Sequence, residues 1–142
     1  MSVDVKYQTS AKATGSGRNG FAGLENGQLS ATMASPKDLG GSGLGHNPEE
    51  FFAIGYAACY LGAMRFAAGA EKLGSVPDDA TVTATVGIGP RSDGGFGLAV
   101  TLKVSLPGVE RPVAEKIIER GHFICPYSNA TRGNIEVKTE LL

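Results

Sequence analysis

Alternating apolar and polar residues predict short strands near the start of the chain. Residues 3–7 alternate with a period of two, which is typical of a half-buried strand. Residues 21–24 and 28–34 are two further segments of this kind, and Asn26-Gly27 between them supplies the positive φ angles of a tight hairpin turn. Three strands are therefore expected first, followed by a loop over residues 35–46.

The rest of the chain contains both helical and β-type patterns. β-branched or alternating residues on either side of Gly94-Gly95 predict a second hairpin. The expected elements are a long helix to about residue 72, strands over 81–89 and 96–105, a helix over 111–122 and a last strand over 135–141. This order predicts an α+β fold instead of a doubly wound parallel sheet.

The long helix has clear capping residues and is then apolar on all sides. Asn47 is a good N-cap, Pro48 fits the first helical position, and two acidic residues follow near the positive end of the helix dipole. Residues 51–63 leave almost no polar face, which predicts that the helix is buried all round. Because a small protein rarely encloses a helix completely, we expect a second subunit to complete the cover in an intertwined homodimer.

Small residues and charges on this helix bear on the same expectation. Gly55, Gly62 and Gly69 recur every seven residues, so they line one side where a second backbone could come close. A membrane span is the alternative interpretation, but Arg65 and Glu71 interrupt the apolar run. We therefore expect no membrane-spanning segment.

Composition places the chain among single globular domains. Its 142 residues, 42% of them hydrophobic, are enough for one domain over residues 1–142 with a core that needs no disulfide or metal. A formal net charge of −1 argues against a broad phosphate-binding surface, so nucleic acid is not expected as a partner. The first 20 residues have no apolar run, so we expect no signal peptide and a cytoplasmic location. In that reducing compartment the two cysteines are not a structural staple by default.

Residues 15–20 match the dinucleotide-binding pattern G-x-G-x-x-G, but their context does not fit. A strand and an Asn-Gly turn follow, not a helix whose N-terminus could hold a pyrophosphate. A glycine-rich turn between strands is the better interpretation. It presents the guanidinium of Arg18 at a sterically open position.

A metal site could be drawn from His46, Cys59, His122 and Cys125, but the spacing is poor. His122-x-x-Cys125 is one half-site without a second pair, whereas structural zinc sites generally show two. We expect no bound metal or cofactor.

The two cysteines fit redox chemistry better. Cys59 lies in the apolar helix beside the small residues, where a pocket next to a thiol could form, and a buried small hydrophobe is the competing interpretation. Cys125 follows a helix, and Pro126 is expected to break the chain and expose the thiol. The two residues could form a cycling pair.

A thiolate inside an apolar helix needs a cation. Lowering the pKa of Cys59 from about 8.5 to about 6 corresponds to roughly 3–4 kcal/mol, and a mid-helix residue gains little from the helix dipole. Arg18 is the best-placed arginine, and a buried arginine needs a carboxylate, for which Glu49 is the candidate. Ten residues, about 15 Å along a straight helix, separate Glu49 from Cys59. Either the helix starts later and the Glu49 loop folds back, or the two residues come from different chains.

At these residues the sequence resembles the organic hydroperoxide resistance proteins, the Ohr branch of the Ohr/OsmC family. The resemblance covers nearly the whole chain and is strongest over residues 47–59 (NPEEFFAIGYAAC), 86–98 and 125–135 (CPYSNATRGNI). The last segment is the most specific, because in the OsmC branch the tyrosine after Cys-Pro is expected to be replaced.

The resemblance implies an Ohr/OsmC-like fold, in which antiparallel β-sheets wrap around two central helices in an intertwined homodimer. It implies a thiol peroxidase with its site at the subunit interface. Cys59 is then the peroxidatic cysteine, Cys125 the resolving cysteine, Arg18 the activating cation and Glu49 the carboxylate that holds it. Glu50 competes with Glu49, but the acid of the family directly follows Asn-Pro.

The implied reaction reduces organic hydroperoxides to alcohols through a Cys59 sulfenic acid and a Cys59–Cys125 disulfide. An external dithiol of the lipoyl type, or a lipoylated protein, would reset the pair. Two other functions use the same residues: an OsmC-type general peroxidase with a different substrate preference, and a redox-sensing module whose disulfide changes its affinity for a partner. A purely structural protein would instead have unreactive thiols.

Overall fold

The computed structural model describes residues 2–142, and the chain divides after Pro48 into two compact units. The first unit contains an antiparallel sheet in which the strands follow their order in the chain. Its elements are β1 (Ala11–Gly15), β2 (Gly20–Leu24), β3 (Ser30–Thr32) and the short 3-10 helix η1 (Lys37–Leu39). The turn that joins β1 to β2 is the glycine-rich segment, and β2 follows it directly, so the interpretation as a turn between strands is confirmed.

The prediction of a strand over residues 3–7 is wrong. No strand includes residues 2–10, and Val3, Val5 and Tyr7 are 78%, 62% and 82% exposed, so their alternation meets no apolar surface in this chain. The first strand is β1 instead. The hairpin turn predicted at Asn26-Gly27 is confirmed between β2 and β3, and Gly27 has a φ of 76°.

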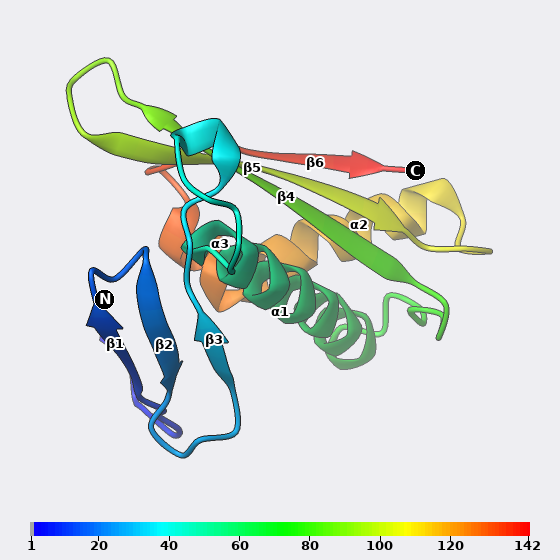
Figure 1. Cartoon of the computed structure of the whole chain (residues 1–142). Helices are drawn as coiled ribbons and strands as arrows, with labels where there is room; N and C mark the ends of the chain where they lie inside the picture. The colour runs from blue at the N-terminus through cyan, green and yellow to red at the C-terminus, as the bar shows by residue number, and fades with distance from the viewer. Residues whose placement is uncertain (1) are drawn as a thin grey trace. The chain divides into compact units, whose positions relative to one another are not determined.

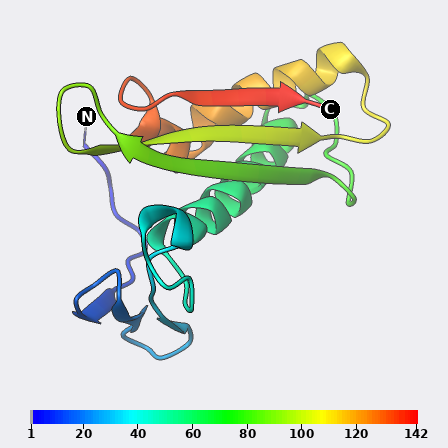
Figure 2. The same ribbon diagram turned by 45° about the horizontal axis from the view of Figure 1, so that its top comes forward.

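The second unit is a three-stranded sheet with its helices on one face (Figures 1 and 2). In chain order its elements are α1 (Pro48–Ala70), β4 (Thr81–Pro90), β5 (Phe96–Ser105), α2 (Arg111–Ile124), α3 (Pro126–Thr131) and β6 (Val137–Leu141). The predicted α+β class is confirmed, and both long helices begin and end within a few residues of the predicted bounds.

The last strand corrects the expectation of purely antiparallel sheets. β4 and β5 form an antiparallel hairpin, but β6 pairs with β5 in parallel, with Leu102 opposite Thr139. The chain reaches β6 through α2 and α3, and parallel neighbours require such a crossover. This crossover brings the end of α2 against β6, where His122 Nε2 lies 2.8 Å from Thr139 Oγ1.

The core of the second unit lies between the sheet and its helices. Alternate residues of β5 point inward, and α1 and α2 contribute large apolar side chains to the same cluster. The buried side chains include Tyr56, Tyr60, Met64, Val100, Leu102, Val104, Ala114, Ile117 and Cys125.

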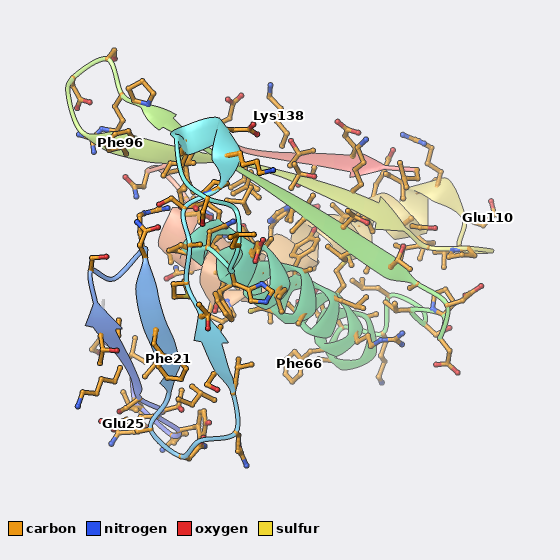
Figure 3. The ribbon with its side chains drawn as sticks, in the orientation of Figure 1. Phe21, Glu25, Phe66, Phe96, Glu110 and Lys138 are labelled. Carbon is orange, nitrogen blue, oxygen red and sulfur yellow. The ribbon has the colours of Figure 1, made fainter. Side chains whose placement is uncertain are left out.

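Within the single chain helix α1 is buried on one side only, so the burial on all sides that the sequence predicts requires a second subunit. Ile54 and Phe66 are 67% and 65% exposed, and Figure 3 shows Phe66 projecting from α1 on the side away from the sheet. An alanine Cβ at Gly62 or Gly69 would meet no atom within 4 Å. The sheet and α2 can cover only one side of a helix, so the other side keeps an apolar surface.

By length and composition alone, α1 could also cross a membrane. Its contacts are those of a core helix: Tyr56 and Tyr60 are fully buried, and Arg65 donates hydrogen bonds to the carbonyl oxygens of Val76 and Pro77 at 2.9 and 2.8 Å.

Candidate active site

The two cysteines lie face to face in the second unit, although 66 residues separate them. Cys59 is midway along α1 and Cys125 is at the junction of α2 and α3, and both are free thiols. Their Sγ atoms are 3.3 Å apart. A disulfide requires about 2.05 Å, so a closure of little more than 1 Å would join them. The fold therefore brings together the two residues that the sequence indicated as a cycling pair.

Cys59 is half-buried, whereas Cys125 is fully buried, which corrects the prediction that Pro126 exposes the second thiol. Pro126 occupies the first position of α3, where its fixed φ angle favours a new helix. The Cys125 N–H donates to the carbonyl oxygen of Gly121 at 2.8 Å, and the Cys125 carbonyl accepts from the N–H of Asn129 at 3.0 Å. Cys125 thus passes from one helix to the next inside the core, and Cys59 is the thiol that a small molecule can approach.

Three aromatic side chains cluster between α1 and the start of α3. Phe52 packs edge-on against Tyr56, with ring centroids 6.0 Å apart, and Tyr127 packs tilted against both rings. A Cβ at Gly55 would lie 2.8 Å from the hydroxyl oxygen of Tyr127. Gly55 is therefore small to admit Tyr127, whereas the sequence pattern had assigned all three helical glycines to the approach of a second backbone.

Local contacts hold Cys59 in its protonated form. Burial, followed by the hydrogen bond with Cys125, raises the pKa of Cys59 to about 11, while a hydrogen bond from the backbone N–H of Tyr127 acts in the opposite direction. At that pKa only about one molecule in ten thousand carries the thiolate at neutral pH. Chemistry at this sulfur therefore requires a cation in addition to these contacts.

A hydrogen-bonded network of side chains lies next to the cysteines. The Tyr56 hydroxyl is 2.9 Å from Ser128 Oγ and 3.2 Å from Thr131 Oγ1. His122 Nδ1 is 2.9 Å from Ser128 Oγ, and its Nε2 is 2.8 Å from Thr139 Oγ1. Sequence reasoning missed this network because it missed α3. The three-residue spacing of the hydroxyls at 128 and 131 was the available signal.

The four predicted site residues lie in different parts of the structure. Arg18 is half-buried in the turn between β1 and β2, in the first unit. Glu49 is in the first turn of α1, in the same helix as Cys59, and Glu50 next to it is exposed. Because α1 begins at Pro48, the alternative of a later helix start with a folded-back Glu49 loop is wrong. About 15 Å of helix separates Glu49 from Cys59.

Two other arginines have defined partners. Arg120 makes an ion pair with Glu71 at 2.7 Å and lies over the ring of Phe123. Arg132 donates to the backbone carbonyl of His122 at 2.6 Å. Within residues 2–142, no three His, Cys, Asp or Glu side chains are grouped to hold a metal ion.

Known proteins are similar to this chain in sequence and in fold. Residues 40–140 match the family described as OsmC-like protein. The chain is 44% identical over 138 residues to the organic hydroperoxide resistance protein of Xanthomonas axonopodis pv. citri, covering 96% of this chain and 95% of that protein. A solved organic hydroperoxide resistance protein from Vibrio cholerae, with captopril in one of its active sites, superposes with a TM-score of 0.91 at 43% identity, covering 99% of this chain and 95% of that one. Another from Elizabethkingia anophelis has a TM-score of 0.90 at 46% identity, with 98% of each chain covered. The chain therefore belongs to the Ohr/OsmC family, and within it to the organic hydroperoxide resistance proteins.

Proposed function

We propose that this protein is a thiol-dependent peroxidase that reduces organic hydroperoxides to alcohols. The observation that carries the proposal is the half-buried Cys59 sulfur at 3.3 Å from the fully buried Cys125 sulfur. A reachable thiol beside an enclosed one fits a division between a peroxidatic and a resolving cysteine. The names of the relatives supply the substrate class.

The proposed cycle has three steps. The Cys59 thiolate attacks the terminal oxygen of the hydroperoxide, the O–O bond breaks, and the alkoxide takes up a proton and leaves as an alcohol. Cys125 then attacks the sulfur of the Cys59 sulfenic acid, and water leaves as the disulfide forms. An external dithiol of the lipoyl type, free or on a lipoylated protein, reduces the disulfide by two exchanges. No bound cofactor takes part.

Activation of Cys59 is assigned to Arg18. The local contacts leave this thiol protonated, so a guanidinium must stabilise the thiolate and donate hydrogen bonds to the peroxide oxygens, where negative charge develops. Glu49 holds the guanidinium in this proposal. Since Glu49 is about 15 Å from Cys59 along one helix, we assign the carboxylate at each site to the other subunit of a homodimer. The exposed apolar side of α1 supports such an assembly.

The substrate preference follows from the aromatic surroundings of Cys59. Phe52, Tyr56 and Tyr127 form an aromatic cluster on the half of α1 that precedes Cys59, so alkyl hydroperoxides should react faster than hydrogen peroxide. Each CH₂ group that is buried adds up to about 0.8 kcal/mol to binding. A cytoplasmic location, where dithiols keep both cysteines reduced, completes the proposal.

Two cysteine variants test the proposed function. Cys59→Ser should abolish hydroperoxide consumption, whereas Cys125→Ser should complete one turnover and then be inactivated as the sulfenic acid oxidises further. Full turnover by Cys59→Ser would contradict the proposal. A steady-state assay with excess dithiol distinguishes an enzyme from a redox sensor, which would not turn over repeatedly. The ratio of rates with organic and hydrogen peroxide distinguishes a general peroxidase.

A further inference from the structure

The hydrogen-bonded network around His122, called the His122 chain below, takes no part in the proposed chemistry. It nevertheless contacts every segment that carries the reacting sulfurs. Tyr56 is three residues before Cys59 in α1, and His122 is three residues before Cys125 in α2. The side chains of Ser128 and Thr131, which are 4% and 5% exposed, come from α3. Several of these residues line a cavity of about 280 Å³ within the second unit.

Counting protons fixes the direction of this chain. Five contacts join its members: His122 to Ser128, His122 to Thr139, Ser128 to Tyr56, Tyr56 to Thr131, and the Thr131 hydroxyl to the Ser128 carbonyl. A neutral imidazole and four hydroxyls supply one proton each. With the proton on Nδ1, His122 donates to Ser128, Ser128 to Tyr56, Tyr56 to Thr131 and Thr131 to the carbonyl, while Thr139 donates to Nε2. Every contact then has one proton.

The other neutral tautomer leaves one contact without a proton. With the proton on Nε2, His122 donates to Thr139, whose own proton then serves none of the five contacts. Ser128 donates to Nδ1 and Tyr56 donates to Ser128, so the single Thr131 proton must serve both Tyr56 and the carbonyl. The geometry therefore favours the Nδ1–H form of His122. Burial and the charge of Arg132 also lower the pKa of His122, which keeps the ring neutral.

The His122 chain fixes α3, and Cys125 directly precedes α3. The Cys125 sulfur lies 3.3 Å from the Cys59 sulfur. The backbone of Tyr127, between Cys125 and Ser128, acts to lower the pKa of Cys59. Ser128 and Thr131 are tied to Tyr56 on α1 at 2.9 and 3.2 Å, so the His122 chain holds Cys125 against the helix that carries Cys59.

We propose that His122, as the neutral Nδ1–H tautomer, is a positioning residue for disulfide closure: through Ser128 and Tyr56 it holds Cys125 against Cys59. The assignment of closure to a catalytic cycle rests on the proposed peroxidase function. When the chain is broken, Cys125 spends less time in contact with Cys59, and a sulfenic acid at Cys59 survives longer. A larger share of it then reacts with a second hydroperoxide to give sulfinic acid.

The tautomer is tested first, on the unmodified reduced protein. The protein has two histidines, so a long-range ¹H–¹⁵N correlation spectrum contains the signals of two imidazoles. A His46→Gln variant assigns them. The expected result at neutral pH is a His122 ring protonated on Nδ1 and bare on Nε2. A ring protonated on Nε2 would overturn the proposal.

Closure is tested with diamide, a thiol oxidant that needs no hydroperoxide. One thiolate adds to the N=N bond of diamide, and the second thiol then displaces the hydrazine product as the disulfide forms. A Cys125→Ser background reports the first addition alone, so the ratio of the two rates isolates closure. His122→Phe should slow closure roughly tenfold, which corresponds to about 1.4 kcal/mol, whereas His122→Asn, which can still donate to Ser128, should retain most of the rate.

His46→Phe, at an exposed histidine of the first unit, is the matched control and should close at the unmodified rate. Thermal melting checks that each variant is folded, and Ser128→Ala, which removes one oxygen atom, carries the same expectation if His122→Phe does not fold. Closure at the unmodified rate in folded His122→Phe or Ser128→Ala would overturn the proposal. Because diamide bypasses peroxide chemistry, this result stands even if the protein fails to consume hydroperoxides.

Discussion

Replacing Arg18 with alanine is expected to return the pKa of Cys59 to the value set by its local contacts, about 11. The peroxidase proposal requires a pKa of about 7 or below, and the difference corresponds to about 5.4 kcal/mol. That is an upper figure, because solvent reaches the half-buried sulfur and screens its charge. A guanidinium at 4 Å contributes about 4 kcal/mol at an effective dielectric constant near 20, and at 8 Å about half of that.

These magnitudes require direct contact between Arg18 and the sulfur. A charged hydrogen bond adds about 1.5–3 kcal/mol to the Coulomb attraction, and the two together reach the required sum only at short distance. Arg18→Lys should therefore give an intermediate pKa, since an ammonium keeps the charge but lacks the planar set of donors. Arg91→Ala is the control, because Arg91 bonds to Asp93 at 2.8 Å in the turn between β4 and β5.

The rate of alkylation by iodoacetamide, followed against pH, measures the thiolate. All variants carry Cys125→Ser so that a single thiol titrates. Because Cys125→Ser removes contacts that help to raise the pKa of Cys59, the thiolate fraction at pH 7 should fall by at most roughly ten-thousandfold in Arg18→Ala. A more basic thiolate is also a better nucleophile, which recovers about half of this loss on a logarithmic scale. The expected net loss of rate is therefore up to about a hundredfold. A profile for Arg18→Ala that coincides with the reference would refute the assignment of Arg18 as the activating cation.

Two further predictions concern packing and pH. Gly121→Ala places a Cβ 2.6 Å from Met64 Cγ in the core, so it should reduce the free energy of unfolding by about 1–3 kcal/mol in urea denaturation. At Gly62 an added Cβ meets open space, so Gly62→Ala should raise the free energy of unfolding of the single chain by up to about 1 kcal/mol. The same methyl group should weaken self-association, measured by sedimentation. An unchanged association constant for Gly62→Ala would contradict a close helix contact there. Because the pKa of His122 is lowered on folding, the unfolded chain binds more protons, so stability should be full above about pH 6.5 and fall as the pH drops towards the folded pKa. His122→Asn should flatten this dependence, and a slope that persists would show that another group causes it.

The sequence predicted those elements whose residues bury an apolar surface within one chain. The long helix could be bounded because Asn47-Pro48 is a strong start, and α2 because its apolar residues recur on one side. The strand over residues 3–7 failed for the converse reason, since its alternation meets no partner surface. The strand that does form, β1, is exposed at all five residues, so it has no apolar pattern to detect. Its pairing with β2 comes from the intervening turn.

For the candidate site, the sequence indicated the two cysteines but not the residues that surround them. Cys59 and Cys125 were indicated by chemistry and by resemblance, and the contact between them is a product of the crossover that leads to β6. The burial of Cys125 could not be foreseen, because Pro126 is equally suited to end one helix or to begin another. That single ambiguity concealed α3, and with it the hydroxyls of Ser128 and Thr131 that complete the network around His122.

The proposed activity makes opposing demands on the surroundings of Cys59. An alkyl hydroperoxide binds best to apolar surface, but the same burial raises the pKa of the thiol to about 11. Polar side chains around the sulfur would lower the pKa of Cys59 only by replacing part of the apolar surface. The buried polar groups bond to other partners: throughout residues 2–142 every buried side-chain nitrogen or oxygen has a hydrogen-bond partner. The Tyr56 hydroxyl, for example, is hydrogen-bonded to Ser128 and Thr131. Under the proposed mechanism, what remains to stabilise the thiolate is the guanidinium of Arg18. One fixed guanidinium supplies the required charge through a single side chain, so the rest of the surroundings can stay apolar for the alkyl group of the substrate.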